Sequence, residues 1–147
     1  MIKLTYPTHN FRIKEEANKE FIFDEVRRQW TRLSPEEWVR QNFLQYLIQV
    51  KRYPASLISV EKEIKTPELK KRYDIVVYKK ERPWMIVECK EMEVSLNDAV
   101  IKQVLNYNAY LEVDFLVITN GSSTYVFETC SQQWLPDFPD YDDAQNG

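Results

Sequence analysis

Glycine is nearly absent from this sequence of 147 residues, and long hydrophobic runs are missing altogether. The two glycines are Gly121 and Gly147. Glycine-rich phosphate loops and dinucleotide-binding fingerprints need several glycines at fixed spacing, so both are excluded, and no NTPase motor is recognisable. No apolar stretch approaches the roughly 20 residues that a membrane-spanning helix requires, so no membrane is expected as a partner.

Histidine and cysteine are also scarce, which limits the chemistry of any site. His9 is the single histidine, and the cysteines are Cys89 and Cys130. A structural zinc site takes about four ligands, so zinc is not expected. Hydrolysis through a histidine base is poorly supported because His9 lies in an N-terminal segment with few order-promoting features. Few cysteines and no signal peptide indicate a cytoplasmic protein.

Charge is unevenly distributed along the chain. The formal net charge is −3, yet residues 62–90 contain nine Lys or Arg against five Asp or Glu. Residues 136–147 contain four aspartates and no basic residue. The length predicts one domain, which we place at residues 1–135, followed by an acidic, disordered tail at 136–147.

Hydrophobic periodicity predicts a mixed α/β domain with a central sheet and helices packed on it. We expect helices at 33–53 and 95–111, a helical turn at 25–30, and strands or hairpins at 11–24, 56–64, 73–79, 84–90 and 114–130. Ser34 is a good N-cap for the first helix, with Glu37 completing a capping box. Ser95 is the expected cap of the second, with Asp98 three residues on.

Charged residues interrupt two strands that otherwise look buried, at Asp74, Glu88 and Lys90. Side chains alternate along a strand, so Glu88 and Lys90 share a face and lie about 7 Å apart. If the strands pair, Asp74 approaches Glu88. Two close carboxylates repel each other unless a divalent cation lies between them, and Mg²⁺ commonly takes one or two protein carboxylates. A lysine beside such a site can orient water and stabilise phosphoryl charge.

A plainer interpretation stands beside this one, because Glu-x-Lys is common on exposed strands. The preceding residues, "WMIV", are too apolar for an edge strand, however, so Glu88 and Lys90 end a buried one. Charges at that position either face solvent just past the core or serve a site.

Four segments in order give a resemblance to a known family: "LSPEEWVRQ", "KRYDIVVY", "MIVECK" and "QVLNY". Together they resemble the N-terminal nuclease domain of type I restriction enzyme R subunits, within the PD-(D/E)xK nuclease superfamily. The resemblance covers roughly residues 20–121. It implies a restriction-endonuclease-like core, a central mixed β-sheet flanked by helices, and a metal-dependent DNA endonuclease activity. Tyr73 stands where the superfamily has its proline.

The resemblance also implies roles for individual residues. Asp74 and Glu88 would bind Mg²⁺, with Mn²⁺ as a substitute, and the backbone carbonyl of Cys89 would be a further ligand. Lys90 would be the catalytic lysine. Glu37 matches an upstream acidic residue of the family, although a capping box explains a glutamate there equally well.

Two further features match the family on the second helix and in the basic stretches. Gln103 and Tyr107 match a Gln-x-x-x-Tyr pattern and share a helix face; a role at the site is favoured for Gln103, and packing for Tyr107. Arg40, Lys71 and Arg72 are candidate DNA contacts, which would act on phosphates without reading sequence. Arg40 could instead pair with Glu37.

Partners follow from the same resemblance: DNA, other restriction-modification subunits, and a second copy of the chain, since cutting both strands often needs two active sites. Two alternative functions remain open. The chain could be a catalytically silent DNA-binding module of the same fold, or an assembly module whose aromatic residues form a partner surface.

Overall fold

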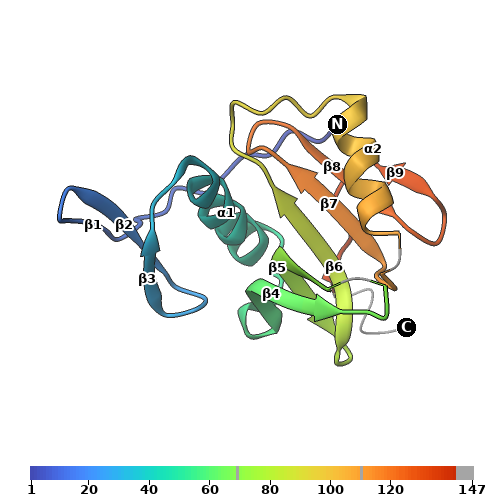
Figure 1. Ribbon diagram of the computed structural model, residues 1–147, viewed down its shortest axis with the longest axis horizontal. Helices are drawn as coiled ribbons and strands as arrows, with labels where there is room; N and C mark the ends of the chain where they lie inside the picture. Colours follow the sequence, from blue (N-terminus) through green and yellow to red (C-terminus); the bar gives the residue numbers. More distant parts are fainter. Residues whose placement is uncertain (69, 110, 142–147) are drawn as a thin grey trace.

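A computed structural model describes residues 1–68, 70–109 and 111–141, and it contains two β-sheets (Figure 1). The small sheet has the order β1-β2-β3 and the large sheet the order β4-β5-β6-β7-β8-β9. The strands are β1 (Ile13–Glu16), β2 (Lys19–Asp24), β3 (Gln29–Arg32), β4 (Ile58–Lys65), β5 (Lys70–Lys79), β6 (Arg82–Cys89), β7 (Phe115–Thr119), β8 (Thr124–Glu128) and β9 (Gln133–Leu135).

In the part of the chain that the structure describes, two α-helices, α1 and α2, accompany these sheets. Helix α1 (Pro35–Gln45) continues into a π-helical turn (Tyr46–Val50), and a short 3₁₀ turn (Ala55–Leu57) precedes β4. Helix α2 (Asp98–Tyr107) lies in the connection between β6 and β7. None of the helices within the described ranges is long and apolar enough to cross a membrane.

The large sheet is mixed, as the family resemblance implied. Strands β6 and β7 run parallel, and the other neighbouring pairs run antiparallel. A parallel pair needs a long crossover, which here contains α2. Strand β6, which contains Glu88, is central, with β5 on one side and β7 on the other. This is the α/β architecture, a central mixed sheet with helices, expected of a restriction-endonuclease-like core.

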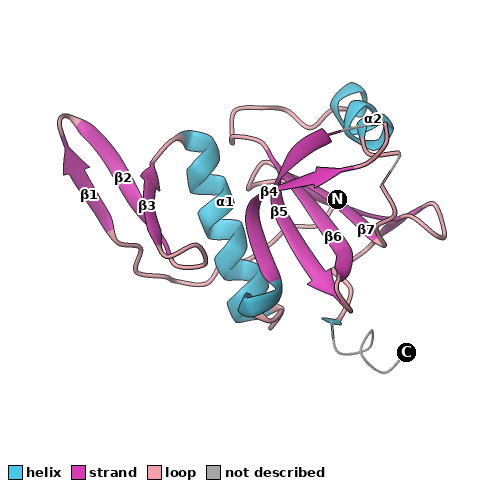
Figure 2. Cartoon of the chain, turned by 60° about the horizontal axis from the view of Figure 1, so that its bottom comes forward, coloured by secondary structure: helices cyan, strands magenta, loops and turns pink. Residues whose placement is uncertain are grey.

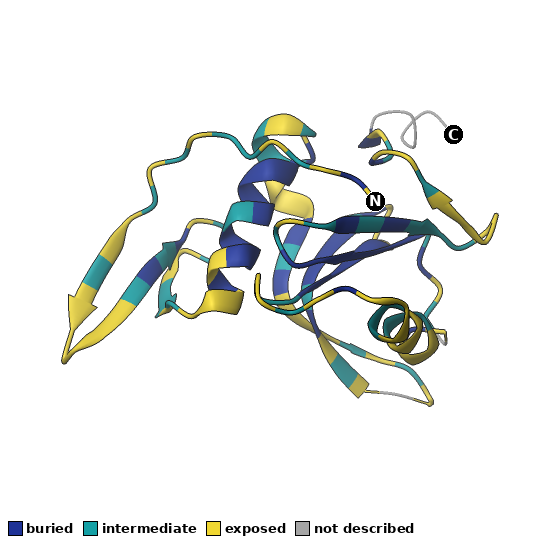
Figure 3. Cartoon of the chain, turned by 90° about the horizontal axis from the view of Figure 1, so that it is seen from above, coloured by how far each residue is buried: buried dark blue, intermediate teal, exposed yellow. Residues whose placement is uncertain are grey.

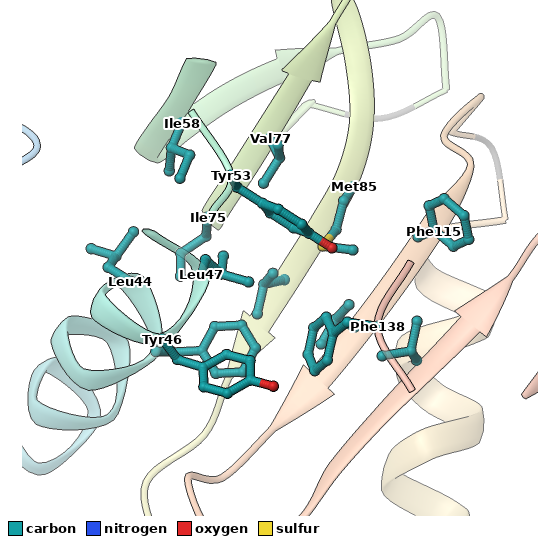
Figure 4. Packing of buried hydrophobic residues seen from close by; sticks show 14 of the residues in the cluster. Leu44, Tyr46, Leu47, Tyr53, Ile58, Ile75, Val77, Met85, Phe115 and Phe138 are labelled. Carbon is teal, nitrogen blue, oxygen red and sulfur yellow. The ribbon is translucent and has the colours of Figure 1, made fainter. Parts of the chain in front are cut away.

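The helices cover opposite faces of the large sheet. Val39 and Phe43 of α1 pack in the main core cluster with Ile75 and Val87, whereas Leu105 of α2 packs on a second cluster that includes Ile86. Since Ile86 and Val87 are consecutive on β6, the two clusters lie on opposite faces. Figure 4 shows the main cluster, where side chains from the π-helical turn, β5 and β6 converge.

The predicted disordered tail is partly wrong. Phe138 and Tyr141 are 5% and 4% exposed and belong to the main core cluster. The Tyr141 hydroxyl donates to the carbonyl of Tyr78, and Tyr53 donates to that of Pro139. Aromatic burial therefore fixes residues 136–141 despite their acidic composition. The rest of the predicted tail, residues 142–147, lies outside the described residues.

Helix starts are partly as predicted. The Ser34 hydroxyl accepts the Glu37 N–H at 3.1 Å, which confirms Ser34 as the cap of α1. The second helix begins later than expected, because Asn97, and not Ser95, accepts the N–H of Val100. Asn and Ser are comparable caps, so the sequence alone could not choose between them.

The helical turn expected at residues 25–30 is instead a turn followed by β3. The Asp24 carboxylate accepts the N–H groups of Val26 and Arg27, which closes a tight turn after β2. Trp30 then pairs with Phe23 across the small sheet. The turn closed by Asp24 and the cross-strand pairing are thus more favourable here than a short helical segment.

Candidate functional site on strands β5 and β6

The predicted carboxylates lie opposite each other on neighbouring strands. Ile75 pairs with Val87, so the next opposed positions are Asp74 and Glu88. Both are largely withdrawn from solvent, with side chains 14% and 11% exposed. Lys90 directly follows β6 and anchors the chain there, since its N–H donates to the Thr119 carbonyl at 2.8 Å. The three residues predicted from the sequence, Asp74, Glu88 and Lys90, therefore lie in one region of the large sheet.

The backbone of β5 does not alternate regularly at Asp74. Tyr73 packs in the second core cluster and Ile75 in the main one, although residues two apart on a regular strand share a face. Asp74 lies between them and turns toward α1. One carboxylate oxygen accepts the Cys89 N–H at 2.8 Å and the other accepts from Arg40 at 3.1 Å.

Glu88 has a different basic partner. Its carboxylate accepts from the ammonium group of Lys71 at 2.6 Å. The same ammonium lies 4.4 Å from the ring centre of Tyr107 and 4.8 Å from that of Tyr73, so it forms cation–π contacts with both. Tyr107 is 48% exposed, so packing does not account for it; it covers the Lys71–Glu88 ion pair from α2.

Arg40 is the centre of an ion-pair network on the α1 side. Its side chain is 7% exposed. The guanidinium donates to both carboxylate oxygens of Glu37, to Glu61 at 3.3 Å and to Asp74 at 3.1 Å. Arg40 therefore pairs with Glu37, as one of the two sequence-based alternatives predicted, and it also contacts Asp74; its role as a DNA contact stays a prediction.

The Glu37 carboxylate is not used for capping. It accepts from Arg40 and from the Gln41 amide at 3.1 Å, and Gln41 also donates to Asp24 at 2.8 Å. Glu37 is 4% exposed, so it is a buried charge held by its partners. Arg40 lies between Glu37 and Asp74 and bonds to both carboxylates, so Glu37 can position the Arg40 guanidinium.

Burial sets the electrostatics of the two carboxylates, Asp74 and Glu88. It raises the pKa of Asp74, against the lowering effects of the Cys89 N–H and Arg40. Burial likewise raises the pKa of Glu88, against the hydrogen bond from Lys71, and the charge of Asp74 adds to the increase. Each carboxylate is therefore a site where added positive charge is favourable.

Sequence reasoning missed two acidic residues beside Arg40 and Asp74. Partial burial and then the charge of Asp74 raise the pKa of exposed Glu36, while Arg40 and Lys90 lower it. Glu61 on β4 has a left-handed backbone (φ 52°). Its carboxylate accepts hydrogen bonds from Arg40 and, at 3.2 Å, from Arg27. Glu36 could have been found as the neighbour of Glu37 in "PEEW"; nothing in the sequence marks Glu61 or Arg27.

Three other candidates are less closely involved. Gln103 is exposed on α2, and its side chain makes no hydrogen bond with the residues that the structure describes. Arg72 is exposed on β5. The Cys89 side chain is buried in the main core, and burial raises the pKa of its thiol well above the ordinary value. Cys89 therefore contributes backbone groups, not a thiolate.

The donor set has the oxygen chemistry that Mg²⁺ prefers, namely two carboxylates and a neighbouring backbone carbonyl. In the arrangement described, Arg40 and Lys71 contact these carboxylates, and no three His, Cys, Asp or Glu side chains among the described residues are grouped to hold a metal ion. The donor types thus fit the ion. Binding of Mg²⁺ would require the flexible side chain of Lys71 to break its hydrogen bond with the Glu88 carboxylate.

The fold and the site together define a class of protein: an α/β domain with two largely buried carboxylates on adjacent central strands and a lysine directly after one of these strands. The chain belongs to the family described as type I restriction enzyme R protein N terminus (HSDR_N), whose sequence model matches residues 35–139. That range includes Asp74, Glu88 and Lys90. Comparison with curated proteins gives no match.

Among solved structures, the chain is similar to a fragment of a protein from Vibrio vulnificus YJ016 that is described as an HsdR subunit of a type I restriction enzyme. The identity is 21% and the TM-score 0.44. The match covers 60% of this chain and 20% of that chain, so this chain spans a small part of its relative.

Proposed function

We propose that the chain is a metal-dependent DNA endonuclease domain that hydrolyses phosphodiester bonds. The observation that carries the proposal is the opposition of Asp74 and Glu88 on β5 and β6, with Lys90 beside them and burial raising both carboxyl pKa values. Membership of the type I R protein N-terminal family supports it. DNA and other restriction-modification subunits are the partners that this family suggests.

Each residue has a defined task in this proposal. Asp74, Glu88 and the Cys89 carbonyl would hold Mg²⁺, which supplies Lewis acidity for attack of water on phosphorus. Lys90 orients that water and stabilises developing negative charge. Arg40, itself positioned by Glu37, fixes the Asp74 carboxylate through one oxygen. Gln103 and Arg72 are proposed to contact DNA from exposed positions at α2 and β5.

Cleavage of plasmid and single-stranded DNA with Mg²⁺, with Mn²⁺ and with EDTA tests the proposal. We expect cleavage with either ion and none with EDTA. Lys90→Ala should lower the cleavage rate about 10²- to 10³-fold, which is the usual effect of removing one preorganised charge-stabilising group. Lys102→Ala, an exposed lysine on α2, is the matched control and should cleave at the wild-type rate. Wild type that never cleaves, with either ion, would contradict the proposal.

The Lys71–Glu88 ion pair predicts that Lys71→Ala increases the affinity for metal ions and decreases the affinity for DNA. Lys71→Ala removes the cation that competes with Mg²⁺ for Glu88. Loss of one charge-assisted hydrogen bond corresponds to about a tenfold change, so Mg²⁺ and Mn²⁺ should bind about tenfold more tightly in calorimetry. DNA affinity should fall, because a phosphate contact is lost.

Lys70→Ala is the control for that comparison. Lys70 is the preceding residue, is 60% exposed, and lies 3.7 Å from Glu63 instead of Glu88. It should leave metal affinity unchanged. Equal metal affinity in wild type and Lys71→Ala would mean that Glu88 is not a ligand.

One observation favours a second function, that of a DNA-binding or assembly module that does not cleave. Arg40 and Lys71 already neutralise Asp74 and Glu88, so the carboxylates can be stable without a metal ion. DNA binding that is indifferent to Mg²⁺, with no cleavage by any ion, would support the silent DNA-binding module. Failure to bind DNA at low salt would indicate the assembly role.

A further inference from the structure

The small sheet has a basic, aromatic outer face. Cross-strand pairing puts Lys14, Phe21 and Arg32 side by side, and the neighbouring row contains Arg12, Phe23 and Trp30. Lys19 lies opposite Glu16 at the hairpin end of the same face. Four cations and three aromatic rings thus share this face with one carboxylate, that of Glu16, which contacts Lys14 at 3.0 Å.

The opposite, inner face of the small sheet is acidic, and the part of it around Ile22 and Asp24 packs on the rest of the protein. Ile22 and Asp24 are fully buried there, and Asp24 accepts from Gln41 of α1. Glu15 and Glu20 pair with each other on the same face. The charges of the small sheet are therefore sorted: acidic residues dominate the inner face, and basic residues dominate the outer face.

The outer face is not covered by the main body. Figures 1 and 2 show α1 between the small sheet and the large sheet, with β1 and β2 extending away from both. Seen from above, this hairpin is mostly exposed (Figure 3). Since α1 lies on the inner side of the sheet, at Asp24, the outer face is turned toward solvent.

Cations and rings on the outer face are interleaved. The Arg12 guanidinium lies 4.5 Å from the ring centre of Phe23 and 5.3 Å from that of Trp30. The Lys14 ammonium lies 4.5 Å from the Trp30 ring centre. Phe21, Phe23 and Trp30 are neither fully buried nor fully exposed. Aromatic rings and guanidinium planes are surfaces on which unpaired bases stack, and cations beside them contact phosphates.

We propose that the outer face of β1–β3 binds a single strand of DNA, at a surface separate from the Asp74–Glu88 site. The cations hold the phosphates, and Trp30 with Arg12 provides the stacking surface for bases. Charge complementarity favours a polyanion, and the rings favour unpaired bases over a closed duplex. DNA is chosen as the polyanion because the inference rests on the proposed function in this one respect. The small sheet lies before residues 35–139, so the family match does not include it.

Binding of a fluorescent single-stranded 20-mer, measured by anisotropy in EDTA, tests the proposal without cleavage. Arg12→Gln with Arg32→Gln should weaken binding about tenfold or more at low salt. It should also reduce the slope of log affinity against log salt by about 1.4, about 0.7 for each lost phosphate contact on single strands. Arg52→Gln with Lys65→Gln removes two exposed cations elsewhere and should leave the slope unchanged.

Stacking is tested separately by tryptophan variants. Trp30→Ala should weaken single-strand binding about tenfold, in the range measured for loss of one base–aromatic stack. Trp134→Ala is the matched control, because Trp134 is a half-exposed tryptophan on β9 that packs on Tyr125 and Phe127. Circular dichroism verifies that both variants keep the wild-type secondary structure.

The outcomes separate this inference from the nuclease proposal. Single-strand binding that depends on Trp30, Arg12 and Arg32 supports it, even if no metal ion ever supports cleavage. Binding that is unchanged in these variants overturns it, even if wild type cleaves DNA. A wild type that binds duplex more tightly than single strands, with no effect of Trp30→Ala, overturns it as well.

Discussion

Replacing Asp74 with asparagine should abolish both metal binding and DNA cleavage, with a rate loss of at least about 10³-fold. Asparagine keeps the size of the side chain and one oxygen that can accept the Cys89 N–H, now seen at 2.8 Å. It removes the negative charge that a divalent cation requires. The loss should therefore appear in calorimetric titration with Mg²⁺ or Mn²⁺ and in plasmid cleavage, without loss of the fold.

The same substitution at an exposed carboxylate provides the control. Glu63 lies on β4, is 47% exposed, and contacts Lys70 at 3.7 Å. Glu63→Gln removes one negative charge from the same sheet and should leave metal affinity and cleavage at wild-type values. Cleavage by Asp74→Asn at the wild-type rate would exclude Asp74 from the reaction and with it the proposed centre.

Replacing Arg40 with methionine should produce the largest loss of stability, about 3–5 kcal/mol in the free energy of unfolding. Arg40 is the cation shared by Glu37, Glu61 and Asp74. Without Arg40, the carboxylates of Glu37 and Asp74, which are 4% and 14% exposed, lose their main counter-charge. The cost is far above that of a surface ion pair, because these charges cannot be fully rehydrated in place.

Thermal and urea unfolding measure this loss. For a chain of this size, 3–5 kcal/mol corresponds to a fall in Tm of about 10 °C. Lys102→Met, at an exposed position on α2, should change stability by less than about 0.5 kcal/mol. Adding Glu37→Gln to Arg40→Met should restore part of the loss, because it removes one of the stranded charges. A stability loss below about 1 kcal/mol would show that the network is effectively solvated.

The sequence by itself determined the α/β class, the central sheet and the placement of Asp74 and Glu88 on adjacent strands, although Asp74 lies within β5 and not at its start. It could do so because apolar periodicity and cap residues act locally: "IVV" and "MIV" are too apolar for an edge, and Ser34 starts a helix wherever that helix packs. The hairpin expected at residues 114–130 is also present, with β7 and β8 joined by a turn in which Gly121 has φ 92°.

Only the tertiary structure decided which partner each charged residue takes. Regular alternation would have put Tyr73 and Ile75 on one face, yet the strand breaks that pattern and turns Asp74 toward Arg40. Glu88 instead meets Lys71 beneath Tyr107. These contacts join α1, β5, β6 and α2, and no local pattern specifies contacts between segments so far apart in the chain.

Burial of the tail was decided in the same way. Phe138 and Tyr141 lie in an acidic stretch whose composition predicts disorder, but the main core offers aromatic contacts with Phe43, Tyr53 and Trp84. The sorting of charge between the two faces of the small sheet likewise depends on register, since slipping one residue would exchange the faces. Local physics fixed the elements, and long-range packing fixed their charges in relation to one another.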